Sequence, residues 1–139
     1  MATFNLLKFK KYNIKIIYYE ILTDDCSSTI TIWDDGFNIV DRIEDNISSN
    51  KNVKFCDIIR VHRVQYDYYI KNKNRHPYYF FLIYCTTLES LDKIYIKIST
   101  KNREDCEEIH NMIHEGFNRE DSDEYGLFGS SCSILCSIQ

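Results

Sequence analysis

The side chains best placed to do chemistry lie at the end of the sequence. Cys136 is fourth from the end and is followed by Ser137, Ile138 and Gln139. A cysteine there, an aliphatic residue at the third place and a permissive final residue form the prenylation signal, and a final glutamine favours farnesyl over geranylgeranyl. The transferase needs a thiol on an extended chain, which the run Gly129-Ser130-Ser131 allows. The pattern predicts farnesylation of Cys136; the alternative is an incidental cysteine in a frayed tail.

A second cysteine, Cys132, lies four residues upstream, beside Ile134 and Leu135. One farnesyl chain gives only reversible membrane residence, so stable anchoring requires a second signal. A polybasic run would serve, but residues 120–124 are acidic. Cys132 is therefore the expected palmitoylation site, and an unmodified thiol is the alternative.

The two histidines of the predicted helix do not form a zinc-protease motif. His110 and His114 are four residues apart, which places both on one face of a helix. The metal motif needs Glu directly after the first histidine, and this chain has Asn111. Glu107 shares the face, so a weak surface metal site is the alternative to a polar helix flank.

No other catalytic pattern is present. His62 and His76 have Asp57 nearby in sequence but no nucleophile elbow. Gly126 and Gly129 are too closely spaced for a phosphate-binding loop or a dinucleotide fingerprint. We expect no enzyme activity, no catalytic residue, no metal and no cofactor.

Length and composition indicate one globular domain. The chain has 139 residues, 44% hydrophobic and 27% charged, with a net charge of −4. An acidic balance argues against general nucleic-acid binding. No apolar run reaches the roughly 18 residues of a spanning helix, the first residues have no signal core, and Ala2 excludes N-myristoylation. Abundant Ile, Lys, Asn and Tyr indicate an AT-rich genome, as in apicomplexan parasites or some viruses.

The six cysteines form no C-x-x-C pair. We expect Cys56, Cys85 and Cys106 to be reduced and to act as small buried hydrophobic residues.

The hydrophobic periodicity predicts strands followed by one helix. Alternating β-branched and aromatic residues predict strands at 13–22, 29–33, 37–40, 53–64, 78–86 and 93–98. Polar loops are expected at 45–52 and 71–77. Asn102 is the expected helix N-cap. Gly116 and Asn118 indicate that the helix ends near Arg119. The helix should bury one stripe, made of Cys106, Ile109, Ile113 and Phe117. The prediction is an α+β domain at 1–119 and an acidic, then Gly/Ser/Cys-rich tail at 120–139.

Three segments follow one another within residues 53–113: the motif Val53-x-Phe55-x-Asp57-Ile58, the strand Ile94 to Ser99 and the helix Glu104 to Ile113. Together they resemble the second half of a pleckstrin-homology (PH) domain. Ile109 stands where the family usually has Trp. The resemblance implies a PH-like β-barrel or sandwich of six to seven antiparallel strands closed by one C-terminal helix. Another small sheet with one helix, such as a longin-type domain, is the alternative.

The resemblance also implies a common ligand that this chain is poorly suited to bind. Many PH domains bind phosphoinositides with a basic loop between the first two strands, but the corresponding residues 23–28 are acidic. Basic residues lie instead in a second loop, at Lys71, Lys73, Arg75 and His76, with Lys8, Lys10 and Lys11 near the N-terminus. The tyrosines of 66–69 and 78–81 are expected in the barrel wall and rim, because base stacking would need a basic groove.

These features predict a non-catalytic adaptor on the cytoplasmic face of a membrane. A lipid-modified tail would hold a PH-like domain that recruits a protein partner, with a farnesyltransferase as the modifying enzyme. The competing expectation is a module that senses phosphoinositides or anionic lipids through Lys71–His76.

Overall fold

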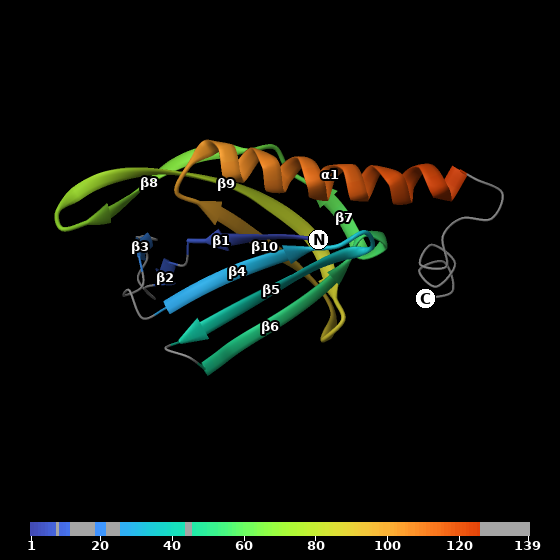
Figure 1. Ribbon diagram of the computed structural model, residues 1–139, viewed down its shortest axis with the longest axis horizontal. Helices are drawn as coiled ribbons and strands as arrows, with labels where there is room; N and C mark the ends of the chain where they lie inside the picture. The colour runs from blue at the N-terminus through green and yellow to red at the C-terminus, as the bar shows by residue number, and fades with distance from the viewer. Residues whose placement is uncertain (8, 12–18, 22–25, 44–45, 126–139) are drawn as a thin grey trace.

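The computed structural model describes residues 1–7, 9–11, 19–21, 26–43 and 46–125; within these, only the backbone is described at 9–11, 19–21, 26–27, 43 and 121–125. The described part has two sheets and one C-terminal helix, α1 (Arg103–Tyr125) (Figure 1). The α+β class is therefore confirmed.

The first sheet has four antiparallel strands. Its order is β1 (Ala2–Leu6), β4 (Cys26–Ile32), β5 (Gly36–Ile43) and β6 (Asn46–Lys54). A 3-10 turn, η1 (Phe55–Asp57), then leads to the second sheet.

The second sheet runs in the order β10 (Ser90–Thr100), β9 (Asn74–Thr87), β8 (Gln65–Lys71), β3 (Tyr19–Ile21) and β2 (Phe9–Lys11), and β7 (Ile58–Val61) also pairs with β9. Its pairs are antiparallel except β3 with β8, where Glu20 lies opposite Ile70. The two sheets meet where the Leu7 N–H donates to the Ser99 carbonyl oxygen at 2.8 Å.

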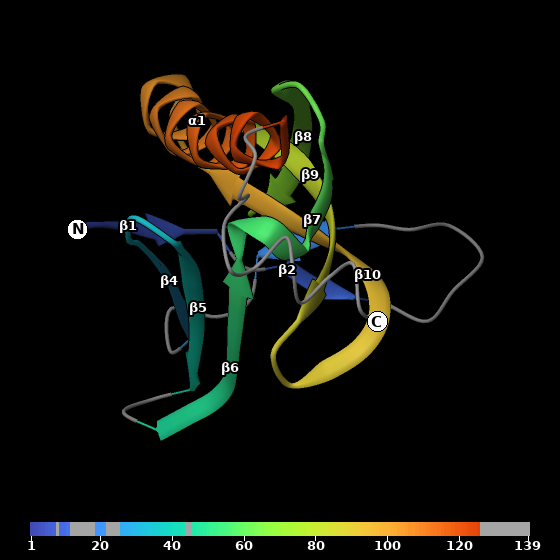
Figure 2. The same ribbon diagram turned by 90° about the vertical axis from the view of Figure 1, so that its right-hand side faces the viewer.

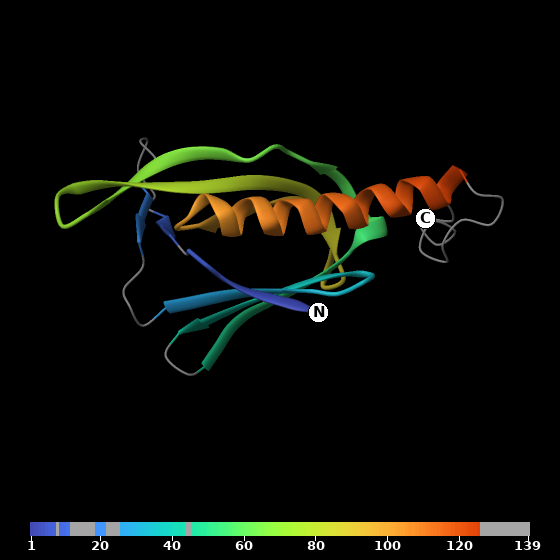
Figure 3. The same ribbon diagram turned by 45° about the horizontal axis from the view of Figure 1, so that its top comes forward.

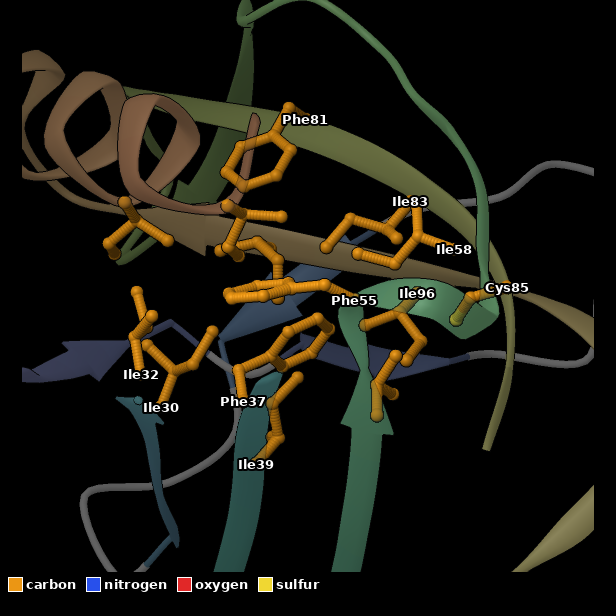
Figure 4. Close-up of a cluster of buried hydrophobic side chains, with 14 of the residues drawn as sticks. Ile30, Ile32, Phe37, Ile39, Phe55, Ile58, Phe81, Ile83, Cys85 and Ile96 are labelled. Atoms are coloured by element: carbon orange, nitrogen blue, oxygen red, sulfur yellow. The ribbon is translucent and has the colours of Figure 1, made fainter. Parts of the chain in front are cut away.

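The core lies between the inward faces of the two sheets, with α1 packed along one side (Figures 2 and 4). Both sheets alternate buried and exposed residues, as a sheet with one covered face requires. The buried side chains include Ile30, Ile32, Phe37, Ile39, Phe55, Phe81, Ile83, Ile96, Ile98, Cys106, Ile109 and Ile113.

The N-terminus of α1 has the predicted cap. The Asn102 Oδ1 accepts a hydrogen bond from the Asp105 backbone N–H at 2.8 Å, and Asn102 Nδ2 donates to the Asp105 carboxylate at 3.1 Å. One otherwise unpaired helix N–H is thereby satisfied. The predicted apolar stripe is also confirmed, because Cys106, Ile109 and Ile113 are fully buried and Phe117 is half-buried.

Gly116 is a point of close packing rather than a helix terminator. The helix continues to Tyr125, past its predicted end near Arg119, so the acidic residues 120–124 are helical. A Cβ on Gly116 would overlap the ring carbons of Phe55, which is itself buried. The glycine therefore lets α1 approach η1.

We expect Gly116→Ala to destabilise the fold although alanine favours helix. The gain in helix propensity is about 1 kcal/mol, while overpacking a core costs about 1–3 kcal/mol. Because the neighbouring group is a rigid aromatic ring, we expect the cost of overpacking to lie at the upper end of this range. Urea unfolding should show a lower midpoint for Gly116→Ala, and the control Asn111→Ala, on the exposed face of α1, should not. A more stable Gly116→Ala protein would contradict the close packing.

Three sequence predictions of strands and loops are wrong. Residues 46–52 of the predicted loop 45–52 belong to β6, the predicted strand 53–64 is interrupted by η1, and the predicted loop 71–77 is two paired strands with a short turn. Polar residues fit β6 because it is an edge strand with much of its length in solvent. The described residues hold ten strands rather than six to seven, and the two sheets do not close into a barrel.

The outer edge of β6 is capped by the β9–β10 turn. The Glu89 carboxylate accepts hydrogen bonds from the Asn52 backbone N–H at 3.2 Å and from Asn52 Nδ2 at 2.7 Å. The Leu88 N–H donates to the Asn52 carbonyl oxygen at 2.9 Å. Burial acts to raise the pKa of Glu89, but the hydrogen bonds from Asn52 outweigh it and the pKa is lowered.

Because of the Glu89 hydrogen bonds, part of the free energy of unfolding should depend on pH in the acid range. A carboxyl whose pKa is lowered by folding stabilises the folded state above its unfolded pKa of about 4.3, and the effect is lost as pH falls through the lower folded value. We expect Glu89→Gln to unfold at lower urea concentration than wild type at pH 7. The difference should shrink towards pH 3. An unchanged difference at both pH values would contradict the role of the charge.

Candidate functional site

The predicted lipidation residues Cys132 and Cys136 lie outside the described residues, as do residues 23–25 of the acidic loop and Lys8. The described chain ends with the last turn of α1 at Tyr125. In Figures 1 and 3 this end of α1 and the turn between β8 and β9 are at opposite ends of the molecule. The end of α1 and the basic cluster are therefore far apart in the described part of the chain.

The basic cluster lies at the tip of the β8–β9 hairpin. The strands pair from Gln65 opposite Phe80 to Lys71 opposite Asn74, which leaves a two-residue turn. Asn72 and Lys73 have φ angles of 53° and 64°. Two central residues with positive φ are typical of the type I′ turn, whose twist matches paired strands.

The hairpin divides the predicted headgroup residues between two faces. Arg75 lies opposite Ile70, and its guanidinium carbon is 4.5 Å from the ring centre of Tyr68. His76 lies opposite Tyr69 on the other face, where the two rings stack at 5.2 Å. Lys71 shares the His76 face, whereas Lys73 lies in the turn. The four residues do not converge on one pocket.

The hairpin also presents exposed apolar residues that the sequence analysis assigned to the barrel wall and rim. Tyr66 is 67% exposed, Tyr68 43% and Ile70 46%. The three occupy alternate positions of β8 and so lie on one face, together with Arg75 and the exposed Pro77 of β9. We call this set the hairpin face. Its signal in the sequence is the alternation of Tyr66, Tyr68 and Ile70.

The opposite face of the same strands holds two buried tyrosines, and a lysine of β10 packs against it. Tyr69 and Tyr78 are at most 2% exposed. Lys97 Nζ donates a hydrogen bond to the Tyr78 hydroxyl at 2.7 Å and lies 4.3 Å from the ring centre of Phe80. Burial lowers the pKa of Lys97, and the charge of Asp67 acts in the opposite direction. The lysine contributes to packing at this face, and nothing in the sequence analysis identified it.

The histidines have structural contacts. The His62 carbonyl oxygen accepts a hydrogen bond from His110 Nε2 at 2.9 Å, which links β7 to α1. The rings of His110 and His114 stack at 5.5 Å, while Glu107 pairs with Arg103 at 2.9 Å. Among the described residues no group of three or more His, Cys, Asp or Glu is placed to hold a metal ion. His62 lies beside α1, whereas His76 stacks on Tyr69 in the β8–β9 hairpin, so the two histidines do not form one site.

The two buried thiols are poor nucleophiles. Burial and the charge of Asp57 raise the pKa of Cys85 to about 11. Burial also raises the pKa of Cys106 to about 11, although a hydrogen bond with Thr100 acts to lower it. Both remain protonated at neutral pH, and only a thiolate attacks. The prediction of burial is therefore confirmed for Cys85 and Cys106 and wrong for Cys56, which is half-buried.

A shallow pocket of about 240 Å³ lies at the end of the first sheet. Its lining combines apolar side chains with charged ones at the rim: Trp33, Phe37, Val53, Leu88, Asp35 and Lys54 are among its residues. Trp33 and Leu88 are exposed. The pocket shares no residue with the hairpin face.

No protein-family model, curated protein or solved structure matches this chain. The helix of the described part is not apolar enough over a sufficient length to cross a bilayer.

Proposed function

We propose that this protein is a non-catalytic, membrane-tethered adaptor. A PH-like domain is held at the cytoplasmic face of a membrane by a farnesyl group on Cys136, with a palmitoyl group on Cys132, and recruits a protein partner. The observation that carries the proposal is the sequence Cys136-Ser137-Ile138-Gln139, which takes Gln139 as the last residue of the chain.

The strand order supports the PH-like part of the proposal. Without the short strands β2 and β3, the chain forms a meander of four strands, a second antiparallel sheet and then one C-terminal helix. Val53, Phe55 and Ile58, which carry the resemblance, are buried together in the core, and Ile109 fills the position of the usual Trp.

The contacts of the polar groups favour a binding role over catalysis. The helix histidines, the Arg103–Glu107 pair and the Asn102 cap stabilise the fold, and the two buried thiols remain protonated. An adaptor needs a stable domain, a tether and a surface that binds its partner.

Incubation of the purified full chain with farnesyltransferase and farnesyl diphosphate tests the proposal. Intact mass should increase by one farnesyl group in wild type and not in Cys136→Ser, whereas Cys132→Ser should be modified like wild type. A wild-type chain that gains no mass would overturn the tether.

The second candidate is sensing of anionic lipids through Lys71, Lys73, Arg75 and His76. Three cations within five residues, in a chain of net charge −4, favour it. Because these residues lie on two faces of the hairpin, the geometry supports contact with a lipid surface better than a clamp on one phosphoinositide headgroup.

A further inference from the structure

The second sheet extends beyond the helix that covers it. Figures 1 and 3 show the β8–β9 hairpin projecting past the first turn of α1. Residues 79, 81, 83 and 85 of β9 face the core, and Pro77 and Arg75 continue the same side of the strand. Where α1 no longer covers this side, Tyr66, Tyr68 and Ile70 are exposed. The hairpin face is thus an uncovered continuation of the core face.

Cations gather at the tip of the hairpin. Lys73 lies in the turn, Lys71 lies beside the turn on the opposite face, and the Arg75 guanidinium lies over Tyr68 on the hairpin face. The one carboxylate of the hairpin, Asp67, lies on the opposite face with Tyr69 and Tyr78. Aromatic residues with a polar tip, surrounded by Lys and Arg, are the side chains that reside at membrane–water interfaces.

We propose that the hairpin face is a membrane-docking surface, in which Tyr66, Tyr68 and Ile70 enter the interface of an anionic bilayer while Lys71, Lys73 and Arg75 contact lipid headgroups. Cations of this kind attract a negatively charged leaflet. A second copy of the chain is a poorer occupant, because a symmetric contact would bring two sets of the same cations together.

This inference extends the proposed function, since a tethered domain would meet the membrane at two places. The described residues end with α1 at Tyr125, and the hairpin lies at the opposite end of the same helix (Figure 1). The tether raises the local concentration of the hairpin at the bilayer, so weak docking suffices.

Flotation of the unlipidated full chain with vesicles tests the docking surface independently of the tether. We expect binding to vesicles of phosphatidylcholine and phosphatidylserine, and little to phosphatidylcholine alone. Each Lys or Arg near the surface contributes about fivefold in partitioning, so the triple variant Lys71→Gln, Lys73→Gln, Arg75→Gln should lose on the order of a hundredfold. The triple variant Tyr66→Ser, Tyr68→Ser, Ile70→Ser should lose about tenfold or more.

Matched controls lie on other exposed surfaces. Lys93→Gln, Lys101→Gln and Tyr95→Ser replace exposed residues outside the hairpin and should bind like wild type. All variants are compared at equal helical circular dichroism and equal thermal midpoint. If the wild-type chain does not bind anionic vesicles, or if the control variants lose as much binding as the hairpin variants, the proposal is wrong.

A fluorescent reporter locates the contact. In the variant Trp33→Phe, Tyr68→Trp, the single indole stands on the hairpin face, and lipids with brominated acyl chains should quench its emission in anionic vesicles. A soluble inositol phosphate should not displace the protein, and displacement would assign a headgroup clamp instead. Binding without quenching would place the contact on another face. Capture of an acidic protein in the absence of vesicle binding would likewise overturn the proposal.

Discussion

The variant Ile109→Asp is expected to be unfolded at neutral pH. Ile109 is fully buried at the centre of the α1 stripe, between Cys106 and Ile113. A carboxylate there would lose its hydration without gaining a partner, which costs several kcal/mol. Domains of this size are stable by about 5–15 kcal/mol. Circular dichroism should show loss of structure and no cooperative thermal transition.

Asn111→Asp is the matched control, because it adds the same charge to the exposed face of the same helix. We expect it to fold with a nearly unchanged midpoint. An Ile109→Asp protein that folds cooperatively would show that α1 is not part of the core.

The second large effect is the loss of membrane association in Cys136→Ser. Farnesylation buries a fifteen-carbon chain at ~0.8 kcal/mol per CH₂, yet a single chain partitions reversibly. Without prenylation the tail never reaches the membrane where acylation occurs, so fractionated cells should contain the variant in the cytosol. A Cys136→Ser protein that remains fully in the membrane fraction would show that another element localises the chain.

Cys132→Ser should have a smaller effect in the same assay. The farnesyl group remains, so a weaker, exchanging membrane pool is expected. The double variant should behave like Cys136→Ser alone. Stronger loss in Cys132→Ser than in Cys136→Ser would contradict the order of the two modifications.

The helix could be predicted because its signals are local. Asn102 caps it, and Cys106, Ile109 and Ile113 repeat on one face, as the sequence indicates. Its end could not be predicted, because Gly116 was interpreted from its own propensity. Whether a glycine ends a helix or permits close packing depends on Phe55, which is distant in sequence.

The edge strand and the hairpin were harder to predict for a related reason. The mostly polar residues 46–52 have low β propensity, but they form the edge strand β6 because they pair with β5 and hydrogen-bond to Glu89. In the candidate site the cations of the hairpin were identified, but their division between two faces was not. That division depends on register, which a one-residue change in the turn would reverse. The exposure of Tyr66 and Tyr68 depends on where α1 begins.

Metabolic labelling with a clickable farnesyl analogue tests the central claim most directly. Cells expressing the wild-type chain with an N-terminal tag should yield a labelled protein, Cys132→Ser should be labelled equally, and Cys136→Ser should carry no label. A wild-type chain without label, or a label that persists in Cys136→Ser, would contradict the membrane tether at Cys136.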